Sequence, residues 1–227
     1  MMTKVKKAQK GPSWLEVGLG AALSVVLGVV LGVAYLVTKP VQTVKEIPKD
    51  APTGAIYYIE GIRDFNKSVV IEEKRKSLAA GETIAVEEGE LNAFIGSLAK
   101  PSAPSPKPGD KGAAPADAKM LDTGTLNIRI RAGKIQFAVP VSYNILSVTG
   151  SVIVQASGEF VRNGSTYEFV PDTFTAGGCP LVHLPIIKDY VLRKFLFAMP
   201  VPEDIASAWG KLAGVSIEGS TLRLKMP

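Results

Sequence analysis

Cys179 and His183 are the natural starting point for a search for chemistry, because they are the only thiol and the only imidazole in the chain. A cysteine and a histidine four residues apart share one face of a helix, and such a pair can act as an activated nucleophile. However, Gly177 and Gly178 precede Cys179 and Pro180 follows it, which favours a loop. We therefore expect a buried thiol beneath a sheet edge rather than a catalytic pair.

Acidic residues form a second cluster at Glu87, Glu88 and Glu90. Carboxylates at the start of a helix complement the positive end of its dipole, and this explains them without catalysis. A zinc site needs three or four ligands, more than one cysteine and one histidine supply. The chain also lacks the G-x-S-x-G, H-E-x-x-H and phosphate-loop motifs. We predict a non-enzymatic protein with no cofactor and no metal.

The chain is organised around Val17–Val37, an uncharged apolar run. As a helix this run is roughly 31 Å long, enough to cross the hydrocarbon core of a bilayer. Trp14 and Tyr35 stand near its two ends, where amphipathic rings are favoured. No small-x-small cleavage site follows the run, which favours an uncleaved anchor over a signal peptide. We expect a transmembrane helix over residues 14–38.

Lysines indicate the orientation of this helix. Four lysines lie in residues 1–13, and three follow the helix within residues 39–53. The positive-inside rule then places the tail 1–13 in the cytoplasm, with the reverse orientation as the alternative. We predict a single-pass protein of the cytoplasmic (inner) membrane. A proline-containing stalk, 39–53, would connect the helix to an extracytoplasmic domain, 54–227.

Small residues recur at every fourth position of the membrane helix, and they are Gly20, Ser24, Gly28 and Gly32. Such a face lets two helix backbones approach closely, so it can support a homo- or hetero-oligomer. Glycine is common in membrane helices, and a helix without a partner is the alternative.

Composition limits the remaining functions. The net charge is +5, and no cluster of lysines and arginines is interleaved with aromatic residues, which argues against nucleic-acid binding. One cysteine allows no internal disulfide, so stability must come from a packed core. The length allows the anchor and one domain of ordinary size.

The predicted domain is α+β. Helices are expected over 64–80 and 88–99, the second with Leu91, Phe94, Ile95 and Leu98 on its core-facing stripe. Short extended segments are expected at 56–62 and 83–86. Residues 100–119 contain five prolines and no large apolar residue, which is typical of a disordered insertion.

Alternation of apolar and polar residues from Leu126 onward predicts an antiparallel meander of about five or six strands. Turns are expected at residues 132–133, 149–150 and 163–164, the last being the Asn-Gly pair typical of hairpins. Residues 173–182 resemble a Gly/Pro loop. A helix near 202–213, ended by Gly214, and a closing strand at 221–226 complete the domain, with helices packed on one face of the sheet.

The helix expected at 185–198 is apolar over more than one stripe, with basic residues on the remainder. Its apolar residues Ile187, Val191, Phe195 and Ala198 are expected to face one way. The candidate ligand or partner surface consists of Ile186, Tyr190 and Phe197. The alternative is a helix enclosed in the core on both sides.

Residues 83–226 resemble bacterial membrane-anchored domains of uncharacterised function, some of them similar to tubular lipid-binding (TULIP-like) proteins. The shared features are the anchor, the segment Glu90–Phe94 (ELNAF), the meander with Asn163-Gly164, and a Pro/Leu-rich turn into a C-terminal helix. The resemblance implies a curved sheet that wraps a helix and holds a lipid. We therefore expect a membrane-anchored binding domain for an apolar, lipid-like ligand or a partner protein. The alternative is a structural accessory subunit assembled through the small-residue face.

Overall fold

The computed structural model describes residues 13–39, 41–46, 48–50, 52, 55–98, 120–145, 148–182, 185–198 and 200–227. Two compact units divide between Leu36 and Val37. Nearly all of the predicted cytoplasmic tail, the predicted insertion at 100–119 and His183 lie outside the described residues.

The first unit contains the helix α1, Trp14–Thr38, except for its last two residues. None of its residues is buried, and it is long and apolar enough to cross a membrane. The predicted N-terminal apolar helix is therefore confirmed, and it is compatible with a single-pass anchor.

The second unit is built on a six-stranded antiparallel sheet with the path β4-β6-β7-β8-β9, on which β5 also pairs with β6. This architecture confirms the predicted α+β class. Positive φ angles at Ala132, Gly133 and Gly164 mark the two tight turns that the sequence predicted. The strands are β4 Leu121–Thr123, β5 Asn127–Arg131, β6 Lys134–Ile145, β7 Val148–Asn163, β8 Thr166–Ala176 and β9 Cys179–Pro180.

Two turn predictions in this sheet are wrong. Residues 173–182 do not form a loop, because β8 continues to Ala176 and a turn with Gly177 at φ 57° leads into β9. Residues 149–150 belong to β7, where Gly150 pairs with Tyr143. A side chain at position 150 would overlap the Tyr143 ring, so this glycine serves close packing rather than a turn.

One face of the six-stranded sheet forms the main core. Residues of β6, β7 and β8 that are paired across the sheet point the same way, and the π-helical turn η2, Leu192–Leu196, contacts β6 and β7. The buried residues are Ile135, Phe137, Val139, Val141, Val154, Ala156, Phe174 and Ala176.

A second, three-stranded sheet with the order β10-β11-β3 was not predicted. Its strands are β3 Ile84–Glu87, β10 Gly214–Glu218 and β11 Thr221–Lys225. Gly214 begins β10 rather than ending a helix. Strand β10 was not predicted, and the chain turns at Gly219 directly into β11.

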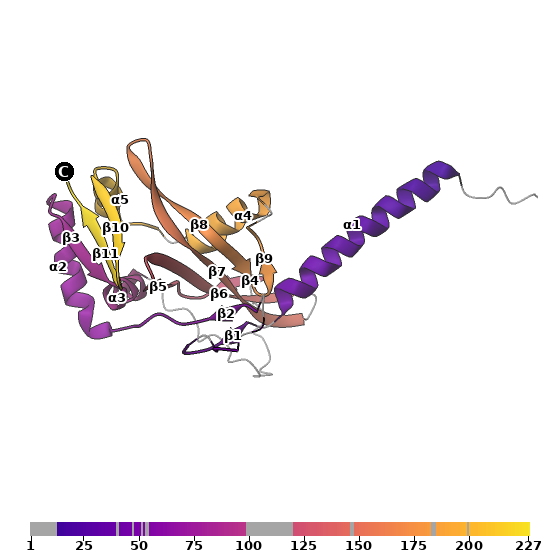
Figure 1. The fold of residues 1–227 in the computed structure, drawn as a ribbon, viewed down its shortest axis with the longest axis horizontal. Coiled ribbons are helices and arrows are strands. Elements are labelled where there is room, and N and C mark those ends of the chain that lie inside the picture. Colours follow the sequence, from indigo (N-terminus) through magenta and orange to yellow (C-terminus); the bar gives the residue numbers. More distant parts are fainter. Residues whose placement is uncertain are drawn as a thin grey trace, which may run out of the picture. The chain divides into compact units, whose positions relative to one another are not determined.

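Three α-helices accompany the three-stranded sheet: α2 and α3 contact β3, and α5 contacts α2. Figure 1 shows them at one end of the second unit. They are α2 Ser68–Ala79, preceded by the 3₁₀ turn η1 Phe65–Lys67, α3 Glu88–Leu98 and α5 Glu203–Trp209. Trp209 connects α5 to the hairpin of β7 and β8, because its Nε1 donates to the Tyr167 carbonyl at 2.9 Å. Its ring also contacts Phe160, with centroids 5.2 Å apart.

The predicted stalk contains folded residues. Gln42–Thr43 (β1) pair in parallel with Tyr57–Tyr58 (β2). Gln155 on β7 donates to the Tyr57 carbonyl at 3.3 Å, which links β2 to the large sheet. The folded part of the second unit therefore includes β1, which begins four residues after α1 ends.

Candidate functional site

The C-terminal helix continues α4, Pro185–Val191, into a π-helical turn, η2, Leu192–Leu196. The Phe197 amide donates to the Leu192 carbonyl at 2.9 Å, a spacing of five residues. Leu192 and Leu196 are the residues that this helix buries against the sheet. Ile187, the first residue of the predicted apolar stripe, is 44% exposed.

The outward side of the helix exposes aromatic and apolar groups. Tyr190 is 62% exposed and Phe197 is 47% exposed, which excludes the alternative of a helix enclosed on both sides. Ile186 lies in α4, but its side chain is outside the described part of the structure. Ile187 joins this surface, although it was not among the residues predicted for it.

Phe197 also has a structural contact. Its ring meets the rings of Phe137 and Phe169 edge-on, with centroids 5.9 Å and 6.1 Å apart. Phe197 therefore anchors the end of the helix on the sheet, while Ile187 and Tyr190 are the more freely presented groups.

Basic side chains accompany these residues. Arg193 and Lys194 are exposed, and Lys188 lies 3.9 Å from Asp189, whose side chain is 65% exposed. Ile187 and Tyr190 follow the i, i+3 spacing that places residues on one side of an α-helix. We call Ile187, Tyr190 and Phe197, together with Lys188, Arg193 and Lys194, the aromatic–basic face.

A buried polar cluster, which we call the polar clamp, lies between α3 and β5. Asn92 is 4% exposed, accepts from the Ile128 amide at 2.7 Å and donates to the Ile128 carbonyl at 2.6 Å. Glu88 accepts from the Ile130 amide at 2.7 Å. These two α3 side chains thus satisfy backbone groups of β5, which pairs with β6.

The same side chains hold the segment between β2 and η1. Glu88 accepts from the Ile62 amide at 2.6 Å, and Asn92 donates to the Ile62 carbonyl at 2.9 Å. Asn127 accepts from the Gly61 amide at 2.7 Å. A Cβ at Gly61 would overlap the Ile128 carbonyl, so the segment fits only without a side chain.

The acidic cluster at 87–90 therefore does more than complement a helix dipole. Glu90 is 4% exposed, accepts from the Glu87 amide at 2.8 Å as a capping residue, and binds Lys74 Nζ at 2.7 Å. The long-range contacts of Glu88 and Glu90 were not predicted. The spacing of polar residues by one helical turn, as for Glu88 and Asn92, was the sequence pattern that could have indicated these contacts.

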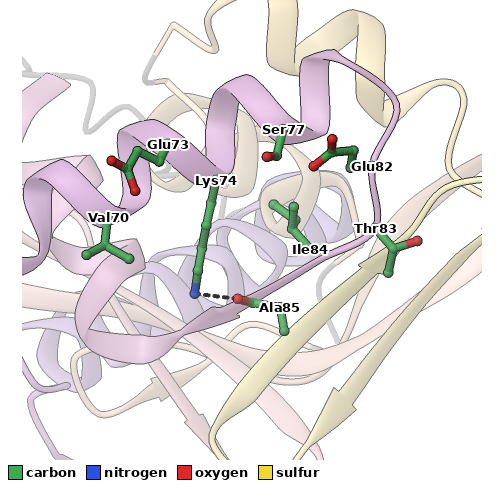
Figure 2. Close-up of a pocket in the computed structure, with 8 residues that line it drawn as sticks. All are labelled: Val70, Glu73, Lys74, Ser77, Glu82, Thr83, Ile84 and Ala85. Carbon is green, nitrogen blue, oxygen red and sulfur yellow. Dashed lines mark hydrogen bonds between the residues drawn. The ribbon is translucent and has the colours of Figure 1, made fainter.

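A groove of about 510 Å³ runs between α2 and β3 and is lined by Val70, Glu73, Lys74, Ser77 and residues 82–85. Figure 2 shows Lys74 reaching from α2 to the Ala85 carbonyl of β3, at 2.6 Å. Because this ammonium group also binds Glu90, its charge is already paired. We interpret the groove as the junction of α2 with β3 rather than as an anion site.

A second groove of about 250 Å³ lies between the end of α2 and α5, beside Met226. Both grooves are open to solvent, and charged residues line each of them. Neither of these two grooves has the enclosed apolar form of a lipid tunnel.

Cys179 is buried, as predicted, but it lies in the strand β9, where it pairs with Ala176, rather than in the predicted loop. Burial raises the pKa of the Cys179 thiol above its ordinary value, which opposes formation of a thiolate nucleophile. Among the described residues, no three His, Cys, Asp or Glu side chains gather into a metal site.

The predicted association face lies on α1. No atom approaches within 4 Å of the Cβ position at Gly20, Gly28 or Gly32, and Ser24 Oγ donates to the Gly20 carbonyl at 2.8 Å. Helix pairing through this face stays a prediction.

Comparison of the chain with family models, with curated proteins and with solved structures found no match. The resemblance to TULIP-like domains therefore also stays a prediction.

Proposed function

We propose that this protein is a single-pass membrane-anchored, non-enzymatic binding domain that uses the aromatic–basic face to hold an apolar, lipid-like ligand or a partner protein. One observation carries the proposal: the C-terminal helix buries Leu192 and Leu196 on the sheet and leaves Ile187 and Tyr190 exposed. Exposed apolar groups that cluster on one helix face mark interaction sites.

The anchor belongs to the same proposal. Its length and hydropathy suit a bilayer, and the lysines on either side favour the tail in the cytoplasm and the second unit outside it. The open form of the two grooves favours binding at a surface over binding inside a tunnel. A lipid-like ligand would therefore lie against the helix rather than within the sheet.

Site-specific photo-crosslinking in intact cells tests the proposal. A photoreactive phenylalanine analogue replaces Tyr190 in one variant and Val170, which is 46% exposed on β8, in a matched control. We expect an adduct to lipid or to a protein from position 190, absent from position 170 and lost when Ile187→Ser is added. Identical patterns from the two positions, or none from position 190, would contradict the proposal.

A further inference from the structure

We infer that the occupant of the aromatic–basic face is the surface of the bilayer that holds α1. Ile187 and Tyr190 would enter the interfacial layer, and Lys188, Arg193 and Lys194 would meet anionic lipid headgroups. This inference rests on the proposed function and names its ligand.

The chemistry of the face matches a bilayer surface. Helices that lie in the interface combine an apolar or aromatic side with lysines and arginines on their flanks. In α4–η2 the exposed groups Ile187 and Tyr190 stand beside two exposed cations and the half-buried Lys188. Asp189 is the one acid within Pro185–Leu196, so this helix presents net positive charge to its surroundings.

Tyr190 suits this location for a second reason. A tyrosine ring is apolar and its hydroxyl is polar, and such rings are enriched at the boundary between headgroups and acyl chains. At 62% exposed, the Tyr190 side chain is available for that contact without any change in the packing of Leu192 and Leu196. A flat docking of the helix would therefore leave the core intact.

Chain length supplies an independent argument. Residues 39–41 connect the end of α1 to β1, and β1 is already paired with β2. A residue of extended chain spans at most about 3.6 Å, so the link from Thr38 to Gln42 reaches roughly 14 Å. With α1 in the bilayer, this short tether holds the folded unit at high effective concentration near the lipid surface, where even a weak contact is populated.

The test uses the full chain in lipid nanodiscs made either of phosphatidylcholine alone or with phosphatidylglycerol. An environment-sensitive fluorophore is attached to Tyr190→Cys, or to Val170→Cys as the control, and Cys179 is buried in both. Val170 pairs with Glu159 on β7, which gives a control of similar exposure beside an acid. Thermal unfolding of each variant checks that the fold is retained.

We expect quenching of the fluorophore at position 190 by lipid-borne quenchers in the anionic discs, and none at position 170. The combined change Lys188→Glu, Arg193→Glu and Lys194→Glu should weaken this quenching at least about fivefold, as should a rise from 50 to 500 mM salt. A water-exposed fluorophore at position 190 in both kinds of disc would overturn the inference.

The two failures are distinguishable. If position 190 stays in water in lipid-only discs but gives a discrete protein adduct in cells, the bilayer inference fails and the proposed function stands. If position 190 neither contacts lipid nor gives a specific adduct, both fail.

Discussion

The polar clamp places polar side chains in the interior, and the aromatic–basic face places apolar side chains at the surface. Both arrangements are the reverse of the usual one. In the clamp, Glu88 and Asn92 are buried, whereas on the face Tyr190 and Ile187 are exposed. Each polar atom of the Glu88 and Asn92 side chains has a defined backbone partner, so these side chains stabilise the fold. Ile187 and Tyr190 are instead exposed at the surface of the helix, which makes the face the better candidate for function.

Variants of Gly61 give the largest expected effect on the clamp side of this comparison. Gly61→Ala places a Cβ against the Ile128 carbonyl, a backbone atom that cannot rotate away, so we expect a loss of about 3 kcal/mol or more in the free energy of unfolding. Gly210→Ala is the control, because the backbone there is helical at φ −66° and the nearest atom is 3.8 Å from the Cβ position. Urea unfolding measures both, and equal stabilities would contradict the clamp.

Glu88→Gln should have the next largest effect. The two carboxylate oxygens accept from the Ile62 and Ile130 amides, and an amide side chain offers only one acceptor for those two donors. We expect a loss of about 1–3 kcal/mol in the free energy of unfolding. Glu82→Gln changes an exposed carboxylate and serves as the control. A Glu88→Gln variant as stable as its control would show that the contacts are not structural.

A smaller, pH-dependent effect is expected where α2 meets α5. Arg75 Nε donates to Asp204 at 2.6 Å, and this bond holds the pKa of the Asp204 carboxyl below its ordinary value. The pair therefore stabilises the fold above about pH 4, and this contribution is lost as the pH falls through the lowered pKa. The difference in unfolding free energy between the native chain and Asp204→Asn should shrink from pH 6 to pH 2.5. A constant difference would contradict the assignment.

Tyr190→Ser should have the smallest effect on stability, within about 0.5 kcal/mol, because the side chain is largely exposed. Phe197→Ser should cost more, since that ring packs on Phe137 and Phe169. Thermal unfolding distinguishes the two. If Tyr190→Ser destabilised the fold as much as Phe197→Ser, Tyr190 would be a packing residue and the comparison between clamp and face would fail.

Local patterns in the sequence were sufficient to predict α1, α3 and the meander. Apolar length predicted α1, and alternation with Asn163-Gly164 predicted β7 and β8. The three-stranded sheet was missed because β3 and β11 are separated by more than 130 residues, and local periodicity carries no information on such pairing.

The candidate site was predicted in part. Tyr190 and Phe197 were identified from a helix with apolar residues on more than one stripe, but the π-helical turn and the exposure of Ile187 were not predicted. On α3 the predicted stripe was also incomplete, since Ala93 and the polar residues Glu88, Glu90 and Asn92 are buried as well as Ile95. Side chains whose partners are distant backbone groups cannot be assigned from spacing alone.

Membrane extraction of the full chain tests the central claim most directly. Isolated membranes are washed with high salt and then with alkaline carbonate, and the chain is followed in pellet and supernatant alongside a variant in which Val26, Val29 and Val30 are changed to aspartate. We predict that the native chain stays in the pellet through both washes and that the variant does not. Release of the intact native chain into the supernatant would contradict the anchored domain and the face assigned to it.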